Sequence, residues 1–252
     1  MTDAESIDTA PTFSNADVDW DKFDSEIYFD NNYRELHHED AQIIGVVADF
    51  FQRVAPGQWR PRAIDVGTGA NLYPAMTMLP LASEIVLYER AFSNRAWLIE
   101  QLHSPAASWA RFWLEIQGRR PEYRRISDPM DVLSRTAKVV KGDLFALEPG
   151  QYDMGTMFFV AESITSREDE FRRAIRRFVA SLVPRAPFAA AFMRESSGYR
   201  VGDREFPACS VDEGDVGRCL ADVAYIEEMQ TVESHDLRDG YDGMIVVCGQ
   251  RK

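Results

Sequence analysis

The sequence has few cysteines and no long apolar run. Its three cysteines, Cys209, Cys219 and Cys248, are an odd number without C-x-x-C spacing, so they predict neither a disulfide framework nor a zinc site. No apolar stretch approaches the roughly 20 residues that a membrane helix needs. The first twenty residues contain no Lys or Arg, which a secretory signal carries at its start. We therefore expect a soluble protein of the cytoplasm.

Positive charge is also scarce. The 252 residues include 28 Lys and Arg against 41 Asp and Glu, a formal net charge of −13. Proteins that bind nucleic acids or anionic membranes use Lys and Arg to neutralise phosphates, so we expect neither partner. Hydrophobic residues make up 45% and aromatic residues 12%, which is too rich for a disordered chain. Length and composition together favour one large α/β domain.

The pattern along the chain alternates between strand and helix periods. Residues 1–19 are acidic and aperiodic, and we expect a disordered tail there, followed by a single domain over residues 20–252. Short apolar runs predict seven strands, at residues 63–66, 84–88, 138–140, 152–160, 188–193, 225–234 and 244–248. Helical spacing predicts helices at residues 40–54, after residue 69, around residues 97–98 and at 105–135, 168–183 and 211–220. This order predicts an α/β fold with a seven-stranded, mainly parallel sheet, covered on both faces and closed by an antiparallel C-terminal hairpin.

A glycine that a dinucleotide-binding loop needs is missing after the first strand. That strand leads into Asp65-Val66-Gly67-Thr68-Gly69, where two glycines allow a tight turn and a close approach of the backbone to a ligand. Loops that bind a pyrophosphate have a third glycine three residues later, and Leu72 stands there instead. This disfavours a nicotinamide-dependent oxidoreductase. Asp65 at the loop entrance favours a cationic ligand, such as an adenosyl sulfonium with a free amino group.

Two further strands also end in a carboxylate. Glu89 ends the second strand, where an acid can accept hydrogen bonds from both hydroxyls of a ribose. Asp143 ends the third strand and can accept from the exocyclic amine of adenine. Acidic residues are common in loops and at helix N-termini, which explains any one of them alone. Three at successive strand ends, beside a G-x-G turn, predict a methyltransferase that uses S-adenosyl-L-methionine (SAM) and releases S-adenosyl-L-homocysteine (SAH).

From Phe23 to the C-terminus the chain resembles the small-molecule N-methyltransferases that act on nicotinamide, phenylethanolamine and indolethylamine. This family has the Rossmann-like class I methyltransferase fold. The motifs that carry the resemblance are Phe23-x4-Tyr28-x4-Tyr33, residues 64–69 with x3-Tyr73, residues 84–86 with x2-Glu89-x4-Asn94, Gly142-Asp143, Tyr199-x2-Gly202-x3-Phe206 and Val246-x4-Arg251-Lys252. The upstream tyrosines together with Tyr73 and Asn94 are far more specific than the G-x-G turn alone.

The resemblance implies roles for individual positions. Tyr28 and Tyr33 would belong to an N-terminal helical lid, within residues 20–58, that closes over cofactor and substrate. The methionine end of SAM would lie against Gly67, Thr68 and Tyr73, its ribose against Glu89 and Asn94, and its adenine against Asp143 and Leu144. We also expect Asp65, Gly69, Arg90 and Phe159 among the cofactor contacts. The resemblance further implies a monomer.

The methyl acceptor would be a small-molecule amine or azaheterocycle, whose unprotonated nitrogen attacks the methyl group in line. Glu162 and Glu195 are the candidate acids that orient the acceptor and take its proton, and Tyr28 is the third candidate catalytic residue. The acceptor side also departs from the family pattern, because Asn32 replaces one of two paired tyrosines and Arg194 stands nearer than Glu195 to the expected acidic position. The alternatives are transfer to an oxygen atom and a chain that binds SAM or SAH without catalysis.

No metal is expected. His37 and His38 are followed by two acids, but adjacent side chains on a helix diverge by about 100°, so the pair is a poor chelate.

Overall fold

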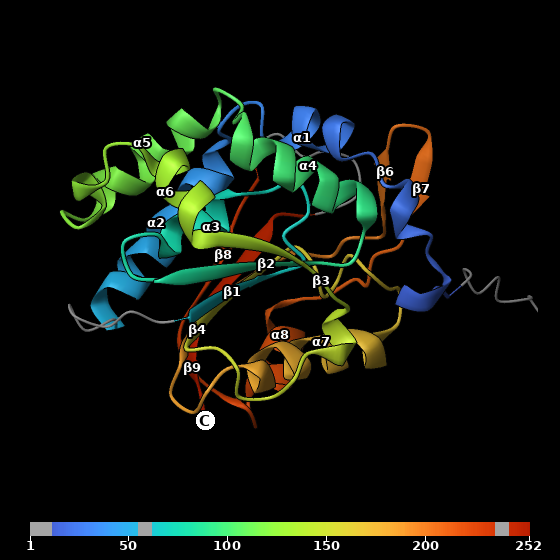
Figure 1. Ribbon diagram of the computed structural model, residues 1–252. Coiled ribbons are helices and arrows are strands. Elements are labelled where there is room, and N and C mark those ends of the chain that lie inside the picture. Colours follow the sequence, from blue (N-terminus) through green and yellow to red (C-terminus); the bar gives the residue numbers. More distant parts are fainter. Residues whose placement is uncertain (1–11, 55–61, 235–241) are drawn as a thin grey trace, which may run out of the picture.

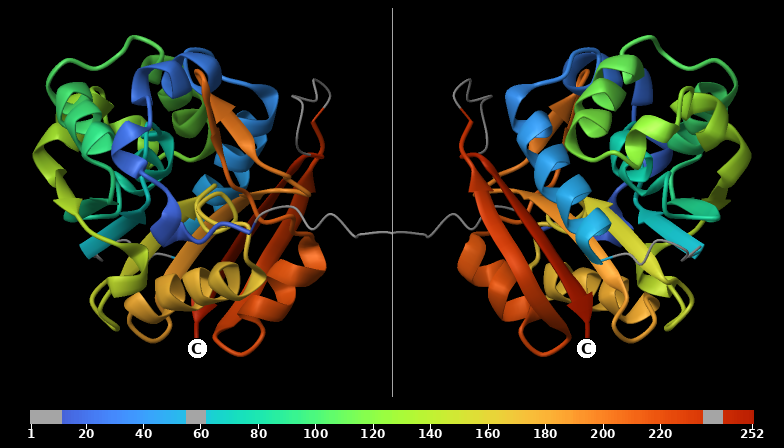
Figure 2. Two further views of the ribbon diagram at one scale, coloured as in Figure 1. Left: turned by 90° about the vertical axis from the view of Figure 1, so that its right-hand side faces the viewer. Right: turned by 90° about the vertical axis from the view of Figure 1, so that its left-hand side faces the viewer.

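The centre of the computed structural model, which describes residues 12–54, 62–234 and 242–252, is a seven-stranded sheet in the order β3-β2-β1-β4-β5-β9-β8 (Figure 1). Strands β1 to β5 pair in parallel, whereas β9 is antiparallel to both β5 and the edge strand β8 (Figure 2). The strands are β1 (Arg62–Val66), β2 (Glu84–Glu89), β3 (Ala137–Lys141), β4 (Met154–Phe158), β5 (Pro187–Met193), β8 (Ala224–Val232) and β9 (Met244–Arg251). The predicted fold class is confirmed. Because the strand order reverses at β1, the carboxyl ends of β1, β2 and β4 border the crevice where such sheets bind ligands.

Helices cover both faces of this sheet, as the alternating pattern predicts. One face carries α2 (His38–Val54), α3 (Tyr73–Met78), α4 (Phe92–His103), α5 (Trp109–Arg119) and α6 (Pro129–Thr136), and the other carries α7 (Glu168–Ser181) and α8 (Glu213–Leu220) (Figure 1). In α7, Phe171, Ile175 and Phe178 recur at helical spacing and are buried. Its first turn holds three acids, which complement the positive end of the helix dipole. Each face of the sheet therefore has its own hydrophobic core.

The single helical segment expected over residues 105–135 is divided. Helix α5 ends at Arg119, a short 3-10 turn spans Tyr123–Arg125, and α6 begins at Pro129. Pro121 follows the end of α5, and a proline disfavours helical backbone for the residue before it. At the next start, the Asp128 side chain accepts a hydrogen bond from the Asp131 N–H. Two prolines thus separate segments that share one apolar stripe.

The N-terminal region is ordered further than the sequence predicts. Helix α1 (Ser25–Asn32) is capped by Asp24, and two 3-10 turns precede it, η1 (Asn15–Asp17) and η2 (Trp20–Lys22). The expected disordered tail over residues 1–19 is therefore wrong for its last part, because η1 packs on the domain and Asn15 is 5% exposed. Residues 1–11 lie outside the described residues.

A small hairpin after β5 completes the fold. It consists of β6 (Tyr199–Val201) and β7 (Arg204–Phe206), joined by a turn in which Gly202 has φ 61°. The hairpin is too short for a periodic signal in the sequence. In the described part of the chain, no helix is long and apolar enough to cross a membrane.

Candidate active site

The loop after β1 opens its backbone toward the carboxyl edge of the sheet. Gly67 and Gly69 have φ of 66° and 58°, a region that side chains disfavour. A Cβ on Gly67 would lie 2.7 Å from both γ-methyl groups of Val160. Only glycine therefore fits at position 67, in both conformation and space. The loop leaves its main chain, rather than side chains, facing the ligand crevice.

A cavity of about 550 Å³ lies at this edge, within the range of small-molecule sites. Several predicted contacts line it. From the N-terminal region and the glycine loop these are Tyr28, Tyr33, Gly67, Thr68 and Gly69. From the ends of later strands they are Glu89, Arg90, Asp143, Leu144 and Phe159. Five others, Asp65, Tyr73, Asn94, Glu162 and Glu195, do not line it.

Glu89 is buried, and both of its oxygens hold the backbone. Its Oε2 accepts from the Gly69 N–H at 2.9 Å, and its Oε1 accepts from the Ala91 N–H at 2.7 Å. Burial raises the pKa of Glu89, and these hydrogen bonds work against the shift. Each carboxylate oxygen keeps a further lone pair. Glu89 thus fixes the glycine loop and can still accept hydrogen bonds from a diol in the cavity.

Asp143 and Arg90 form the next part of the wall. The Asp143 Oδ1 accepts from the Phe145 N–H at 2.8 Å, which orients the carboxylate. The Arg90 Nη1 lies 3.5 Å from the Asp143 Oδ2. Both side chains remain partly exposed at the cavity.

Asp65 and Tyr73 lie behind the cavity. The Asp65 Oδ1 accepts from the Thr156 hydroxyl at 2.6 Å, and its Oδ2 has no hydrogen-bond partner among the described residues. Burial raises the pKa of Asp65 to about 7. Tyr73 is fully buried, stacked on Phe112 at 5.7 Å and edge-on to Tyr33 at 6.0 Å. Both residues support the wall from behind instead of forming it.

Asn94 links the N-terminal region to α4. Its Oδ1 accepts from the Ser25 hydroxyl at 2.7 Å, and the residue is 6% exposed. It therefore positions α1 over the cavity edge without lining the cavity.

The two candidate acids have opposite environments. Glu162 is fully buried behind Ser163 and Met193, which line the cavity. Its Oε1 accepts from the Met193 N–H at 2.9 Å, its Oε2 has no partner among the described residues, and burial raises its pKa to about 7. Glu195 is exposed and pairs with Arg194 at 3.4 Å. The structure brings Glu162 next to the cavity and leaves Glu195 on the surface.

Sequence reasoning missed several lining residues. Asn71 lines the cavity, and its Nδ2 donates to the Tyr33 hydroxyl at 3.2 Å. Tyr199 and Trp20 also line it, although Tyr199 appears in the sequence analysis only as part of a motif and Trp20 belongs to none of the motifs. Asn15 lay in the expected tail, where no periodicity or motif points to it.

These features fit SAM. The main chain of Gly67 and Gly69 lines the cavity, and the acids Glu89 and Asp143 face it, in a space of suitable size. Glu89 offers acceptors for the ribose hydroxyls, and Asp143 offers an acceptor for the amino group of adenine.

Fold and site together define a SAM-dependent methyltransferase, and solved structures share this fold. The N-methyltransferase NodS from Bradyrhizobium japonicum WM9, in complex with SAH, has a TM-score of 0.55 at 9% identity, covering 92% of this chain and 94% of its own. A SAM-dependent methyltransferase from Methanosarcina mazei has a TM-score of 0.56 at 12% identity, covering 80% and 96%. Magnesium protoporphyrin IX methyltransferase from Synechocystis PCC 6803, with bound SAH, has a TM-score of 0.52 at 14% identity, covering 85% and 84%. At these identities the likeness shows the fold alone.

The family follows from the sequence. Residues 12–252 match the model of the NNMT/PNMT/TEMT family, and the chain belongs to it. No curated protein sequence matches the chain. The predicted family resemblance, the methyltransferase activity and the cofactor SAM are confirmed.

Proposed function

We propose that the protein transfers the methyl group of SAM to a nitrogen atom of a small-molecule amine or N-heterocycle. The observation that carries this proposal is Glu162, a fully buried acid with one unpartnered oxygen directly behind the cavity wall. Membership of the NNMT/PNMT/TEMT family supports it further.

The chemistry requires an unprotonated acceptor. SAM supplies an electrophilic methyl group, and in-line attack by a neutral nitrogen forms the new C–N bond as the C–S bond breaks and SAH leaves. A primary or secondary amine then carries an extra proton. With its pKa raised to about 7, Glu162 is suited to take that proton through the Ser163 hydroxyl, which lines the cavity and donates to the Glu162 Oε1 at 3.2 Å. A pyridine-like nitrogen has no proton to lose and needs no base.

Aromatic and neutral groups form the acceptor end of the cavity. Tyr28 lies edge-on to both Tyr33 and Tyr199, with ring centroids 6.0 Å and 6.4 Å apart. Phe158 and Met193 line the same cavity. Such a wall favours a flat or apolar acceptor and excludes water from the reaction.

The deciding experiment is methyl transfer from labelled SAM to matched pairs of acceptors. Each pair shares one carbon skeleton and differs in carrying an amine or ring nitrogen against a hydroxyl group. We expect label on the nitrogen compounds. Label on the hydroxyl partners alone would make the protein an O-methyltransferase.

Binding and catalysis are separated by a thermal shift on the same protein. SAH should raise the melting temperature, because it binds only the folded state. A shift with SAH but no product from a broad panel would identify a chain that binds the cofactor without catalysis, and the proposal would fail.

A further inference from the structure

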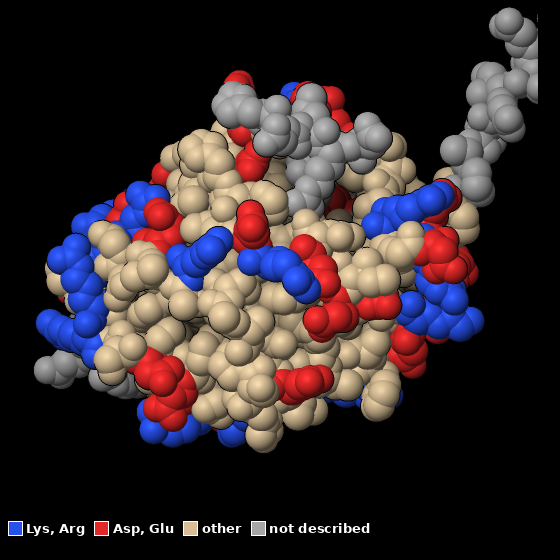
Figure 3. All heavy atoms as spheres, turned by 90° about the horizontal axis from the view of Figure 1, so that it is seen from above, with Lys and Arg blue, Asp and Glu red and all other residues tan. Residues whose placement is uncertain are grey.

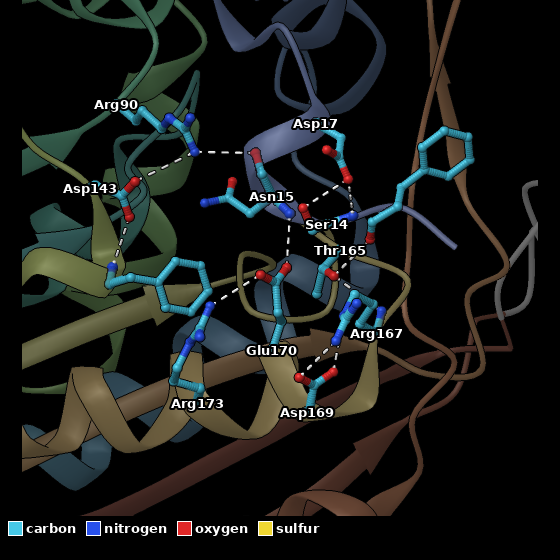
Figure 4. Close-up of polar contacts among 12 residues, drawn as sticks. Ser14, Asn15, Asp17, Arg90, Asp143, Thr165, Arg167, Asp169, Glu170 and Arg173 are labelled. Carbon is cyan, nitrogen blue, oxygen red and sulfur yellow. Dashed lines mark hydrogen bonds and ion pairs between the residues drawn. The ribbon is translucent and has the colours of Figure 1, made fainter. Parts of the chain in front are cut away.

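The N-terminal strap, which we define as residues 13–18, is fastened by hydrogen bonds beside the cavity, which its residue Asn15 lines (Figure 4). The Phe13 carbonyl oxygen accepts from the Ser166 N–H at 3.0 Å and from the Thr165 hydroxyl at 2.9 Å. The Asn15 N–H donates to the Glu170 Oε2 at 2.8 Å. The strap is thereby tied to the loop before α7 and to the first turn of that helix.

Asn15 also contacts Arg90, which pairs with the strand-end acid Asp143. The Asn15 carbonyl oxygen accepts from the Arg90 Nη1 at 3.2 Å, and that nitrogen lies 3.5 Å from the Asp143 Oδ2 (Figure 4). Asn15 is 5% exposed and lines the cavity. Its main chain is therefore held from two sides, beside the carboxylate that ends β3.

The orientation of the Asn15 amide follows from its neighbour Trp20. The indole Nε1–H can only donate, and it lies 2.9 Å from the Asn15 Oδ1. The oxygen must therefore face Trp20, which leaves the NH₂ group on the other side of the amide. Figure 4 shows this nitrogen extending toward Asp143, and no described residue accepts a hydrogen bond from it. The amide donor of Asn15, a residue that is 5% exposed, is thus directed into the cavity.

We propose that the Asn15 amide donates a hydrogen bond to a ring nitrogen of the cofactor's adenine. Adenine presents an amino donor beside an acceptor nitrogen on each of its two polar edges. Asp143 supplies an acceptor and Asn15 a donor, side by side, which is the matching pattern. Asn15 is then a specificity-determining residue for adenine, delivered by the strap. This rests on SAM as cofactor and is independent of the acceptor nitrogen in the proposed function.

The test is a cycle of protein variants against cofactor analogues by titration calorimetry. The ligands are SAH and its 1-deaza, 3-deaza and 7-deaza analogues, in each of which one ring nitrogen is replaced by C–H. The wild-type protein should bind either the 1-deaza or the 7-deaza analogue about tenfold more weakly than SAH, the effect of one hydrogen bond. It should bind the 3-deaza analogue as tightly as SAH, because N3 does not lie beside the amino group. Asn15→Ala should bind SAH about tenfold more weakly than wild type and bind that analogue no worse than SAH.

Two variants separate donor chemistry from the integrity of the strap. Asn15→Asp keeps an oxygen for Trp20 but supplies no donor, so it should lose SAH affinity as Asn15→Ala does. Ser14→Ala is the matched control, because the Ser14 hydroxyl bonds Asp17 and does not line the cavity. We expect it to keep wild-type affinity and the same discrimination among analogues.

Three results would overturn the proposal. They are equal binding of all four ligands by wild type, full discrimination retained in Asn15→Ala, and wild-type SAH affinity in Asn15→Asp. If the wild-type protein failed to bind SAH at all, both the cofactor assignment and this proposal would be wrong. A lack of methylated nitrogen compounds would contradict the proposed function alone.

Discussion

Glu162 is an acid enclosed by protein, and its protonation should govern turnover of amine acceptors. Glu162→Gln removes the base while keeping an oxygen for the Met193 N–H. We expect kcat to fall by about 10²-fold with an amine, as is typical for loss of a general base, and little with a pyridine-like acceptor. In the wild type, kcat/KM should rise with pH through about 7, since the pKa of Glu162 lies there. Steady-state kinetics across pH measures both.

Glu195→Gln is the matched control for this experiment. It makes the same change at the other candidate acid, which is exposed and outside the cavity. It should leave kcat and the pH profile unchanged. Equal losses in both variants, or an unchanged profile in Glu162→Gln, would remove Glu162 from the reaction.

Glu89 offers a second test on a single side chain, because its two oxygens each hold a backbone N–H. In Glu89→Gln, the amide NH₂ must face one of those donors, which costs about 1–3 kcal/mol. We expect SAH affinity to fall at least about tenfold by calorimetry. Glu100→Gln, on the exposed face of α4, should bind SAH as wild type does. Undiminished affinity in Glu89→Gln would exclude the proposed ribose contact.

The sequence predicted cavity-lining residues best where the backbone alone determines their position. Glu89 and Asp143 end parallel strands, so both meet at one edge of the sheet. Asp65 was expected there too, but it shares its face of β1 with Ala63 and pairs with Thr156 of β4. An acid near the end of a strand can face either side of the sheet. Which side it faces depends on how the strand packs in the sheet, and the local sequence does not determine this. Asn15 could not be found, because its role arises only from contacts distant in the sequence.

An aromatic cluster joins the β6–β7 hairpin to the segment between the strap and α1. Phe206 stacks on Trp20 at 5.6 Å and on Tyr199 at 5.3 Å, and it lies edge-on to Phe23 at 5.2 Å. The hairpin has no other described sheet partner. Packing of this ring therefore holds the hairpin, and with it Tyr199, against the cavity.

Phe206→Ala should release this element while leaving the main sheet intact. We expect the KM for the acceptor to rise about tenfold or more, because Tyr199 loses its support, with a smaller change in SAH affinity. Steady-state kinetics and calorimetry compare the two effects. Phe92→Ala is the control, since Phe92 is 64% exposed on α4. A larger loss in SAH affinity than in acceptor KM would contradict this division of the site.

Elements with a clear period were predictable, and short or proline-broken ones were not. Strands β1, β2 and β5 are buried apolar runs, and the seven strands need no tertiary information to be recognised. Apolar residues recur from α5 past Pro121 into α6, so their spacing alone predicts one helix. The end of α5 before Pro121 is predictable only from the effect of proline on the backbone. The three-residue strands β6 and β7 depend on Phe206 packing, which no local pattern contains.

At the level of the whole molecule, the excess negative charge has two parts. Over the face seen in Figure 3, Asp and Glu lie among Lys and Arg, and exposed acids such as Asp131 and Glu168 pair with an arginine. Asp65, Glu89 and Glu162 are different, because all three are buried beside or behind the cavity and burial raises the pKa of each. The surface acids favour solubility, whereas the buried acids cost stability in their ionised form.

The raised pKa values of the buried acids predict that the protein loses stability as the pH rises toward and through neutrality. Asp65 and Glu162 have folded pKa values of about 7, above their values in the unfolded chain. At a pH between the unfolded and the folded pKa, the native state therefore binds more protons than the unfolded state. Stability is therefore fully present at low pH and is lost as pH rises through 7. Between pH 5.5 and 8, the free energy of unfolding should fall by about 2 kcal/mol for each carboxyl. Urea unfolding measures it. Asp65→Asn and Glu162→Gln should each reduce the slope of unfolding free energy against pH by about half, whereas Glu195→Gln should leave it unchanged. A wild-type stability that rises over this range would contradict the prediction and show that both acids are ionised in the fold.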